Sequence, residues 1–224
     1  MKTLHKMLIC CIFFAALVSM SYGSAPNLKL PFESGESWGV TNGYSDGYHV
    51  GKDAYALDFN LGGWDDLGKP ILAVAPGIVK SISFDYDGYG WYVILDHGDG
   101  YESRYAHLIL VTVKENDSVV QGQHLGLCGN TGQKSSGSHL HFVMYKDGNA
   151  YKPEPMSGYV NFTSGNQYVS NNTLIGLKPT SLYSDGFNQN GSSQAVADCY
   201  NLNGGPELIG QPYSDNGNSI YIHS

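Results

Sequence analysis

The sequence is poor in charged residues, and positive charge is especially scarce. Only 14% of its 224 residues are charged, with 12 lysines and arginines against 20 aspartates and glutamates. Such an excess of negative charge is unfavourable for binding nucleic acid or an anionic membrane surface. We therefore expect neither kind of partner. Glycine (29 residues) and tyrosine (17 residues) are abundant instead, which favours a strand-rich protein with many loops.

Long hydrophobic runs are missing, apart from one near the start of the chain. Residues 7–18 are apolar, follow the basic residues Lys2 and Lys6, and precede small residues that end at Gly23. The run is shorter than the roughly 20 residues that span a membrane, and the pattern is typical of a cleaved signal peptide. We predict a signal peptide over 1–23 and a secreted, extracellular protein that does not associate with the membrane after cleavage.

Cysteine is rare as well. Of the four cysteines, Cys10 and Cys11 lie in the predicted signal peptide, which leaves Cys128 and Cys199. An even number of cysteines in an exported chain favours a disulfide. We predict one between Cys128 and Cys199, worth roughly 4 kcal/mol for a closed loop of about 70 residues. Two unpaired thiols are the alternative.

Residues 50–145 contain no convincing helix. Short runs of strand-forming residues, separated by glycine turns, fill 50–145, and Gly98-Asp99-Gly100 is typical of a hairpin turn. The predicted fold class is therefore mainly β, an antiparallel β-sheet domain with long loops over 24–150.

Residues 151–224 are expected to form a loop-rich C-terminal extension. Leu174-Ile175-Gly176 and Leu208-Ile209-Gly210 begin two similar segments, a weak internal repeat that is too short for a solenoid. An ordered extension that completes the fold is the preferred interpretation. Hairpins that wrap the sheet, or a small glycan-binding module, are the alternatives.

Two histidines stand one residue apart in SSGSHLHFVMY (135–145). On a strand, His139 and His141 share one face, while Leu140 and Phe142 point to the other face and into a core. One imidazole of such a pair can bind a metal while the other acts on a bound water. For the motif taken alone, two surface histidines on a half-buried strand remain the alternative.

Further candidate ligands lie upstream. Residues 54–61 alternate between large apolar and small or polar side chains, and Asp58 falls on the polar face of this predicted strand. His49 precedes the strand, and Asp53 follows His49 by four residues. All three side chains are available as ligands.

Another histidine, His107, is expected to share a strand face with Tyr105 in the segment 101–111. A solvated position at the end of the strand is the alternative for this residue.

Five segments carry a resemblance to a known family. They are HVGKDAYALDF, GKPILAVAPGIV, GYGWYVILDHGDGYESRYAHL, VVQGQHLGLCGNTG and SGSHLHF, in this order. The chain resembles the lysostaphin/LytM/β-lytic family of zinc metallopeptidases over about residues 30–148, and the lead-in LPFESGESWGV is similar to the β-lytic branch.

The resemblance implies a Zn²⁺ site held by His49, Asp58 and His141. It also implies that His139 and His107 act on the water and on the transition state. Many members have the spacing HxGxD, which Asp53 fits, so Asp53 remains the alternative ligand. Asp58 is preferred because it lies on the predicted strand and because the β-lytic branch has a longer interval from histidine to aspartate.

The resemblance implies a secreted zinc metalloendopeptidase, a hydrolase whose catalytic domain is 24–150. The expected substrates are glycine-rich peptide cross-links of bacterial peptidoglycan or Gly-Gly bonds in proteins, and we expect a monomer. A non-catalytic cell-wall or glycan-binding module on the same fold is the alternative function. A glycan-binding protein that acts through 151–224 is a further one. The complete set of five site residues favours the enzyme.

Overall fold

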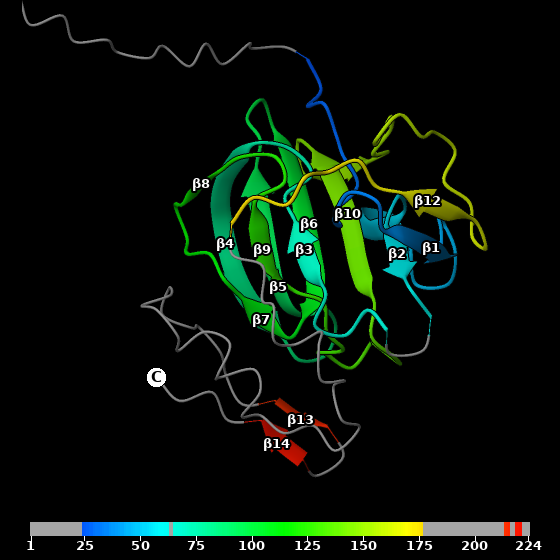
Figure 1. Cartoon of the computed structure of the whole chain (residues 1–224), viewed down its shortest axis with the longest axis vertical. Helices are drawn as coiled ribbons and strands as arrows, with labels where there is room; N and C mark the ends of the chain where they lie inside the picture. The colour runs from blue at the N-terminus through cyan, green and yellow to red at the C-terminus, as the bar shows by residue number, and fades with distance from the viewer. Residues whose placement is uncertain (1–23, 63–64, 177–212, 216–217, 221–224) are drawn as a thin grey trace, which may run out of the picture.

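The computed structural model describes residues 24–62, 65–176, 213–215 and 218–220 (Figure 1). The predicted signal peptide lies outside this part of the chain, as does Leu208-Ile209-Gly210, which begins the second copy of the weak repeat. The single helical element of the described residues is a short 3₁₀ turn, η1 (Gly51–Asp53). None of the helical structure described is long and apolar enough to cross a membrane.

The mainly-β prediction is confirmed, since antiparallel strands make up almost all of the regular structure. The strands are β1 (Ser37–Asn42), β2 (Leu57–Asn60), β3 (Pro70–Leu72), β4 (Gly77–Asp85), β5 (Gly90–Asp96), β6 (Tyr101–Leu108), β7 (Leu110–Val111), β8 (Ser118–Val119), β9 (His124–Leu127), β10 (Leu140–Lys146), β11 (Asn149–Tyr151), β12 (Gln167–Val169), β13 (Tyr213–Asp215) and β14 (Asn218–Ile220).

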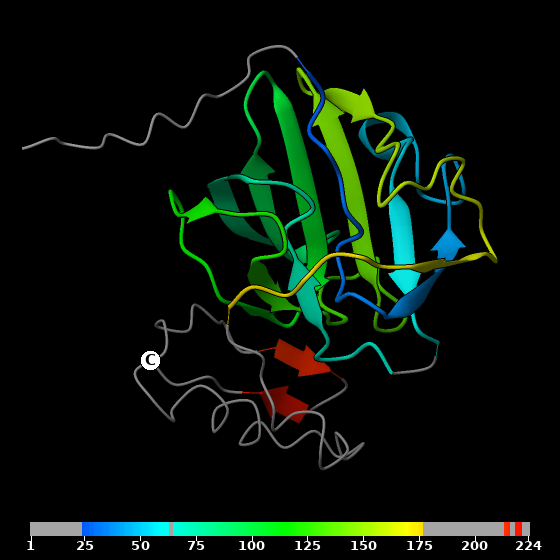
Figure 2. The same cartoon turned by 45° about the horizontal axis from the view of Figure 1, so that its top comes forward.

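A large sheet organises the molecule. Its strands run in the order β12-β1-β2-β10-β6-β5-β4-β8, and β11 pairs with β10 at the side (Figure 1). A second sheet, β3-β9-β7, lies over one face of the large sheet, as the turned view in Figure 2 also shows. Strands β13 and β14 pair only with each other among the described strands.

The main core fills the space between the two sheets. Leu140 and Phe142 of β10 are fully buried there, as predicted, together with Phe59 of β2 and Leu125 of β9. Because successive side chains of a strand point to opposite faces, the residues between them on β2 and β10 are turned to the other face of the large sheet. This second face carries the candidate site.

The local turn chemistry is close to the sequence-based prediction. Strands β5 and β6 pair across the predicted hairpin turn at Gly98-Asp99-Gly100. The predicted strand over 54–61 is shorter in the structure, because β2 spans Leu57–Asn60 and Tyr55 is 38% exposed.

The packing continues past the expected boundary at residue 150. Strand β12 pairs with β1 and so extends the large sheet. Asn172 is buried, and its side-chain amide donates to the carbonyl oxygens of Leu30 at 2.9 Å and Ala73 at 3.1 Å. Residues 151–176 therefore pack as part of the same domain.

The predicted disulfide between Cys128 and Cys199 stays a prediction. Cys128 is 1% exposed and is a free thiol within the described residues, and Cys199 lies outside them. Burial between the two sheets explains why Cys128 behaves as a small apolar side chain there.

Candidate active site

Two adjacent central strands bring the first two site residues together. His141 of β10 and Asp58 of β2 are directly opposite in the strand register. Their side chains point to the same face, where His141 Nδ1 lies 2.9 Å from Asp58 Oδ1. Both residues are 6% exposed. The period-two pattern that buries Leu140 and Phe59 in the core therefore also aligns this pair.

His49 reaches the pair from the loop between β1 and β2. Its Nδ1 lies 2.7 Å from the carbonyl oxygen of Gly43, and because a carbonyl can only accept, Nδ1 carries the proton. The other ring nitrogen, Nε2, is then free to act as a ligand and lies 3.2 Å from Asp58 Oδ1. The loop thus fixes both the position and the tautomer of His49.

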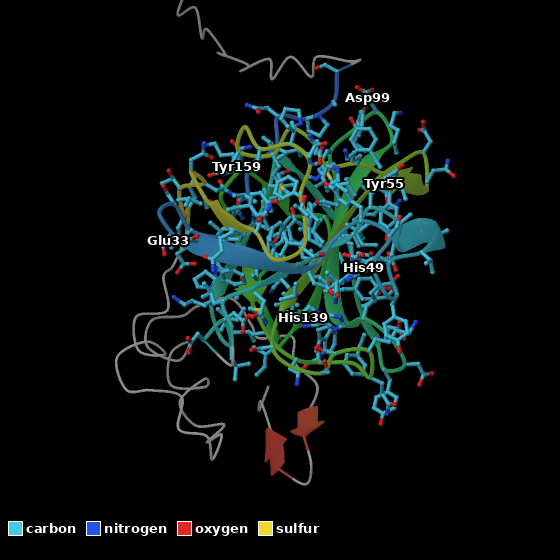
Figure 3. The ribbon with its side chains drawn as sticks, turned by 90° about the vertical axis from the view of Figure 1, so that its right-hand side faces the viewer. Glu33, His49, Tyr55, Asp99, His139 and Tyr159 are labelled. Atoms are coloured by element: carbon cyan, nitrogen blue, oxygen red, sulfur yellow. The ribbon has the colours of Figure 1, made fainter. Side chains whose placement is uncertain are left out.

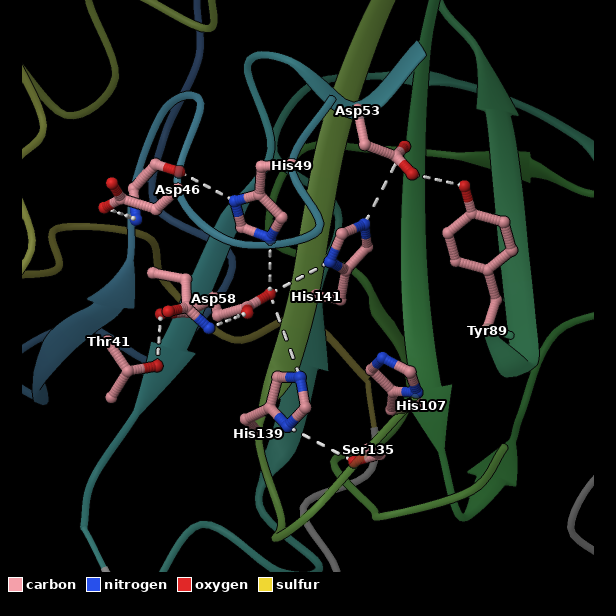
Figure 4. Close-up of polar contacts among 12 residues, drawn as sticks. Thr41, Asp46, His49, Asp53, Asp58, Tyr89, His107, Ser135, His139 and His141 are labelled. Atoms are coloured by element: carbon pink, nitrogen blue, oxygen red, sulfur yellow. Dashed lines mark hydrogen bonds and ion pairs between the residues drawn. The ribbon is translucent and has the colours of Figure 1, made fainter. Parts of the chain in front are cut away.

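The donor atoms fit a metal ion. One ligand atom from each of His49, Asp58 and His141 lies within 4.8 Å of the other two (Figure 4). Two ligands of a tetrahedral zinc ion, each bonded at about 2.0–2.2 Å, are about 3.3 Å apart. The separations of 3.2 Å and 2.9 Å from Asp58 Oδ1 to the two histidine nitrogens are close to this spacing.

The electrostatics of Asp58 and His141 also favour binding of a cation. Burial acts to raise the pKa of Asp58, but hydrogen bonds to His141 and His49, together with the charges of His141 and His139, outweigh it and hold the pKa well below its usual range. Burial acts to lower the pKa of His141, but the carboxylates of Asp53 and Asp58 raise it to about 9. The site is therefore a buried, negatively charged pocket with nitrogen and oxygen donors.

His107 enters the same site through an irregularity that the sequence did not reveal. Between the pairs Trp91–Leu108 and Val93–Tyr105, β6 has one more residue than β5, which is a β-bulge. His107 lies in this bulge with a positive φ of 63°. The prediction that His107 and Tyr105 share a face was wrong, because the bulge turns His107 to the cleft while Tyr105 stays in the core.

His107 and His139 form a second pair beside the three candidate ligands. Their ring centroids are 4.6 Å apart. His107 Nδ1 lies 2.7 Å from the carbonyl oxygen of Thr131, and His139 Nδ1 lies 2.8 Å from that of Gly137. Both Nδ1 atoms therefore carry protons, and Nε2 of each neutral ring has a lone pair available. Burial, with the nearby charges of His139 and His141, lowers the pKa of His107 to about 3.

All four histidines line one cleft of about 380 Å³. His139 Nε2 lies 3.8 Å from Asp58 Oδ1, so this ring borders the ligand set without joining it. His49 and His139 are near each other in Figure 3, whereas Asp99, at the β5–β6 turn, lies at the far end of the molecule. The structure thus brings together all five residues that the sequence singled out.

The cleft also contains polar partners that the sequence did not single out. Asn42 Nδ2 donates to Asp58 Oδ2 at 2.8 Å, and the hydroxyl of Tyr89 donates to Asp53 Oδ2 at 2.5 Å. Asp53, the alternative ligand, is outside the set of three that converge. Asn42 lies opposite Asp58 on β1, but single polar residues at strand ends are too common to be recognised from the sequence.

The chain is similar to known proteins over a range that carries three of the five site residues. The model for peptidase family M23 matches residues 62–153, a range that includes His107, His139 and His141. The peptidoglycan DD-endopeptidase ShyA of Vibrio cholerae is 37% identical over 98 residues, 42% of this chain and 22% of that protein. Lipoprotein NlpD of Yersinia enterocolitica is 36% identical over 86 residues, 38% of this chain and 87% of that one.

Among solved structures, the catalytic domain of the antimicrobial peptidase lysostaphin from Staphylococcus simulans is 29% identical. The match covers 55% of this chain and 90% of that one, with a TM-score of 0.41. The chain spans about a fifth of the length of three curated relatives that it matches, namely 18%, 22% and 20%. On the family model and the match to most of NlpD, the chain belongs to peptidase family M23.

Proposed function

We propose that the protein is a zinc metalloendopeptidase that hydrolyses peptide bonds in bacterial peptidoglycan. The observation that carries this proposal is the convergence of two histidines and one carboxylate, with two further histidines beside them, in a single cleft. Membership of the M23 family and the similarity to a peptidoglycan endopeptidase support it. The peptides of peptidoglycan would be the partner, and export by the predicted signal peptide would bring the enzyme to them.

The proposed metal ligands are His49 through Nε2, Asp58 through Oδ1 and His141 through Nδ1. Two neutral imidazoles and one carboxylate are a ligand set that suits zinc and leaves a fourth position open. When bound there, zinc supplies Lewis-acid polarisation and lowers the pKa of water. The protein contributes the orientation of the ligands, through the carbonyl of Gly43 on His49 and the amide of Asn42 on Asp58.

His139 and His107 are proposed to move the protons. Because both rings hold their protons on Nδ1, each Nε2 can accept one. We assign the general base to His139, whose Nε2 lies nearer the ligand set, 3.8 Å from Asp58 Oδ1. His107 can donate to the developing oxyanion only when its ring is doubly protonated, so its role requires a proton that reaches Nε2 during the reaction.

Glycine-rich cross-links, or Gly-Gly bonds in proteins, are the proposed substrates within this class. The cleft of about 380 Å³ is near the lower end of the usual range for ligand sites. A small cleft favours residues without side chains at the scissile bond. This preference is part of the proposal, as is the monomeric state.

The test is cleavage of pentaglycine and of purified peptidoglycan by the zinc-loaded protein and by His139→Ala. We expect the wild type to cut and the variant to lose about 10²–10⁴-fold in rate while it retains its zinc. Zinc binding without cleavage of either substrate would contradict the proposal and favour a non-catalytic binding module. Removal of zinc by a chelator, followed by recovery on adding zinc back, is the control.

A further inference from the structure

The two ring nitrogens of His141 face two different carboxylates. Nδ1 faces Asp58 Oδ1 at 2.9 Å, inside the candidate metal site. Nε2 points the opposite way, is buried, and has no hydrogen-bond partner among the described residues. A neutral imidazole that offers Nδ1 to a metal carries its proton on Nε2, so this buried nitrogen needs an acceptor.

The carboxylate of Asp53 stands at that position (Figure 4). Its Oδ1 lies 3.9 Å from His141 Nε2, and the two side chains are 16% and 8% exposed. This distance is too long for a hydrogen bond. A small rotation of either side chain would close it, and such contacts commonly tighten once a site is loaded.

Asp53 is itself held in place on its other sides. The hydroxyl of Tyr89 donates to Oδ2 at 2.5 Å, and that of Tyr145 to Oδ1 at 3.4 Å. The guanidinium carbon of Arg104 lies 4.3 Å from the centroid of the Tyr89 ring and 5.2 Å from that of Tyr145. The two tyrosine hydroxyls and the charge of Arg104 therefore stabilise the Asp53 carboxylate in a position that faces His141.

The other two candidate ligands have the same kind of support. The carbonyl of Gly43 accepts from His49 Nδ1 at 2.7 Å, and the amide of Asn42 donates to Asp58 Oδ2 at 2.8 Å. Partners of this kind fix the tautomer and the direction of metal ligands. With Asp53 in this role, all three ligands would have a partner outside the ligand set.

We infer that Asp53 is a positioning residue whose carboxylate accepts the Nε2 proton of His141 and so keeps Nδ1 available for the metal. Tyr89 holds that carboxylate in place. This inference rests on the metal site of the proposed function. It gives Asp53 a role other than that of a ligand, even though its spacing from His49 fits the HxGxD form.

The test is the zinc affinity of the full-length protein, measured by competition with a chromophoric chelator. We expect Asp53→Asn to bind zinc about 10–100-fold more weakly than the wild type at an unchanged stoichiometry. Tyr89→Phe keeps the ring and removes the hydroxyl bond to Asp53, so it should weaken binding by a smaller factor. The controls are Asp87→Asn, an exposed acid of the β4–β5 turn, and Tyr92→Phe, whose ring also lies against Arg104 at 5.1 Å.

A second readout separates positioning from general loss of structure. In zinc-loaded protein with ¹⁵N-labelled histidine, the Nε2 proton of His141 should give a downfield resonance. This resonance should shift in Asp53→Asn and in Tyr89→Phe and stay in place in the two controls. If Asp53→Asn does not fold, the zinc affinity and the His141 resonance of Tyr89→Phe, compared with those of Tyr92→Phe, test the inference instead.

Two results would overturn the inference. Wild-type affinity and an unshifted resonance in Asp53→Asn would show that the carboxylate does not act on His141. Loss of zinc as complete as in Asp58→Asn would make Asp53 a ligand instead. Either result can occur in a protein whose wild type binds zinc and cuts peptides, whereas a wild type without zinc would refute the proposed function itself.

Discussion

A substitution at Gly132 should show how closely the loop behind His107 is packed. Gly132 has a φ of +83°, and a Cβ atom there would lie 2.3 Å from the backbone nitrogen of Gly90 and 2.4 Å from the carbonyl oxygen of Gly88. All of these neighbours are backbone atoms, which cannot move aside as a flexible side chain can. The substitution Gly132→Ala therefore forces the 131–132 loop away from the turn before β5.

The loss in free energy of unfolding expected for Gly132→Ala has two parts, which a matched control variant separates. An alanine at positive φ costs about 1 kcal/mol, and forcing extra volume into a packed region costs a further 1–3 kcal/mol, roughly. Gly148 has a φ of +74° with no atom within 4 Å of its Cβ position, so Gly148→Ala should carry only the first part. We expect free energies of unfolding lower by about 3 kcal/mol for Gly132→Ala and about 1 kcal/mol for Gly148→Ala.

Thermal unfolding of the two variants beside the wild type is the assay. At roughly 2–4 °C per kcal/mol for a chain of this size, the Tm should fall by about 6–12 °C for Gly132→Ala and by about 2–4 °C for Gly148→Ala. Because the carbonyl of Thr131 orients His107, Gly132→Ala should also lower activity at temperatures where it remains folded. Equal Tm values for the two variants would refute the packing argument.

Three further predictions concern the site and the core. Asn42→Ala removes the hydrogen bond to Asp58 Oδ2 and should weaken zinc binding about 10-fold or more in chelator competition; unchanged affinity would contradict this. Burial lowers the pKa of His97. Below about pH 6.5 the unfolded chain therefore binds more protons than the folded protein, and the free energy of unfolding should decrease as the pH is lowered. In urea unfolding, His97→Gln should lose less stability than the wild type between pH 7.5 and pH 5. An equal loss in the two proteins would contradict this role of His97. Tyr105→Phe leaves the buried N–H of Val74 without its acceptor and should cost about 1–3 kcal/mol in urea unfolding.

Alternation on the strands made much of this site predictable from the sequence. A face that buries Leu140 and Phe142 must turn His141 to the opposite side, and the same argument applies to Asp58 next to Phe59. Turn chemistry likewise predicted the β5–β6 hairpin. These features depend on local periodicity, which a single sequence displays directly.

Features that depend on tertiary contacts were not predictable in this way. The bulge that turns His107 into the cleft depends on the register between β5 and β6, which alternation along one strand does not reveal. Asp53 has the spacing of a ligand, but its loop directs it to the far nitrogen of His141. The burial of Cys128 between two sheets was hidden for the same reason, since its neighbours in space lie far away in the sequence.

The most direct test of the central claim is the zinc content of the purified protein, measured for the wild type, Asp58→Ala and Asp53→Ala in parallel. We expect about one zinc per wild-type chain, none in Asp58→Ala, and bound but more weakly held zinc in Asp53→Ala. Zinc that persists in Asp58→Ala and is lost from Asp53→Ala would contradict the proposed ligand set of His49, Asp58 and His141.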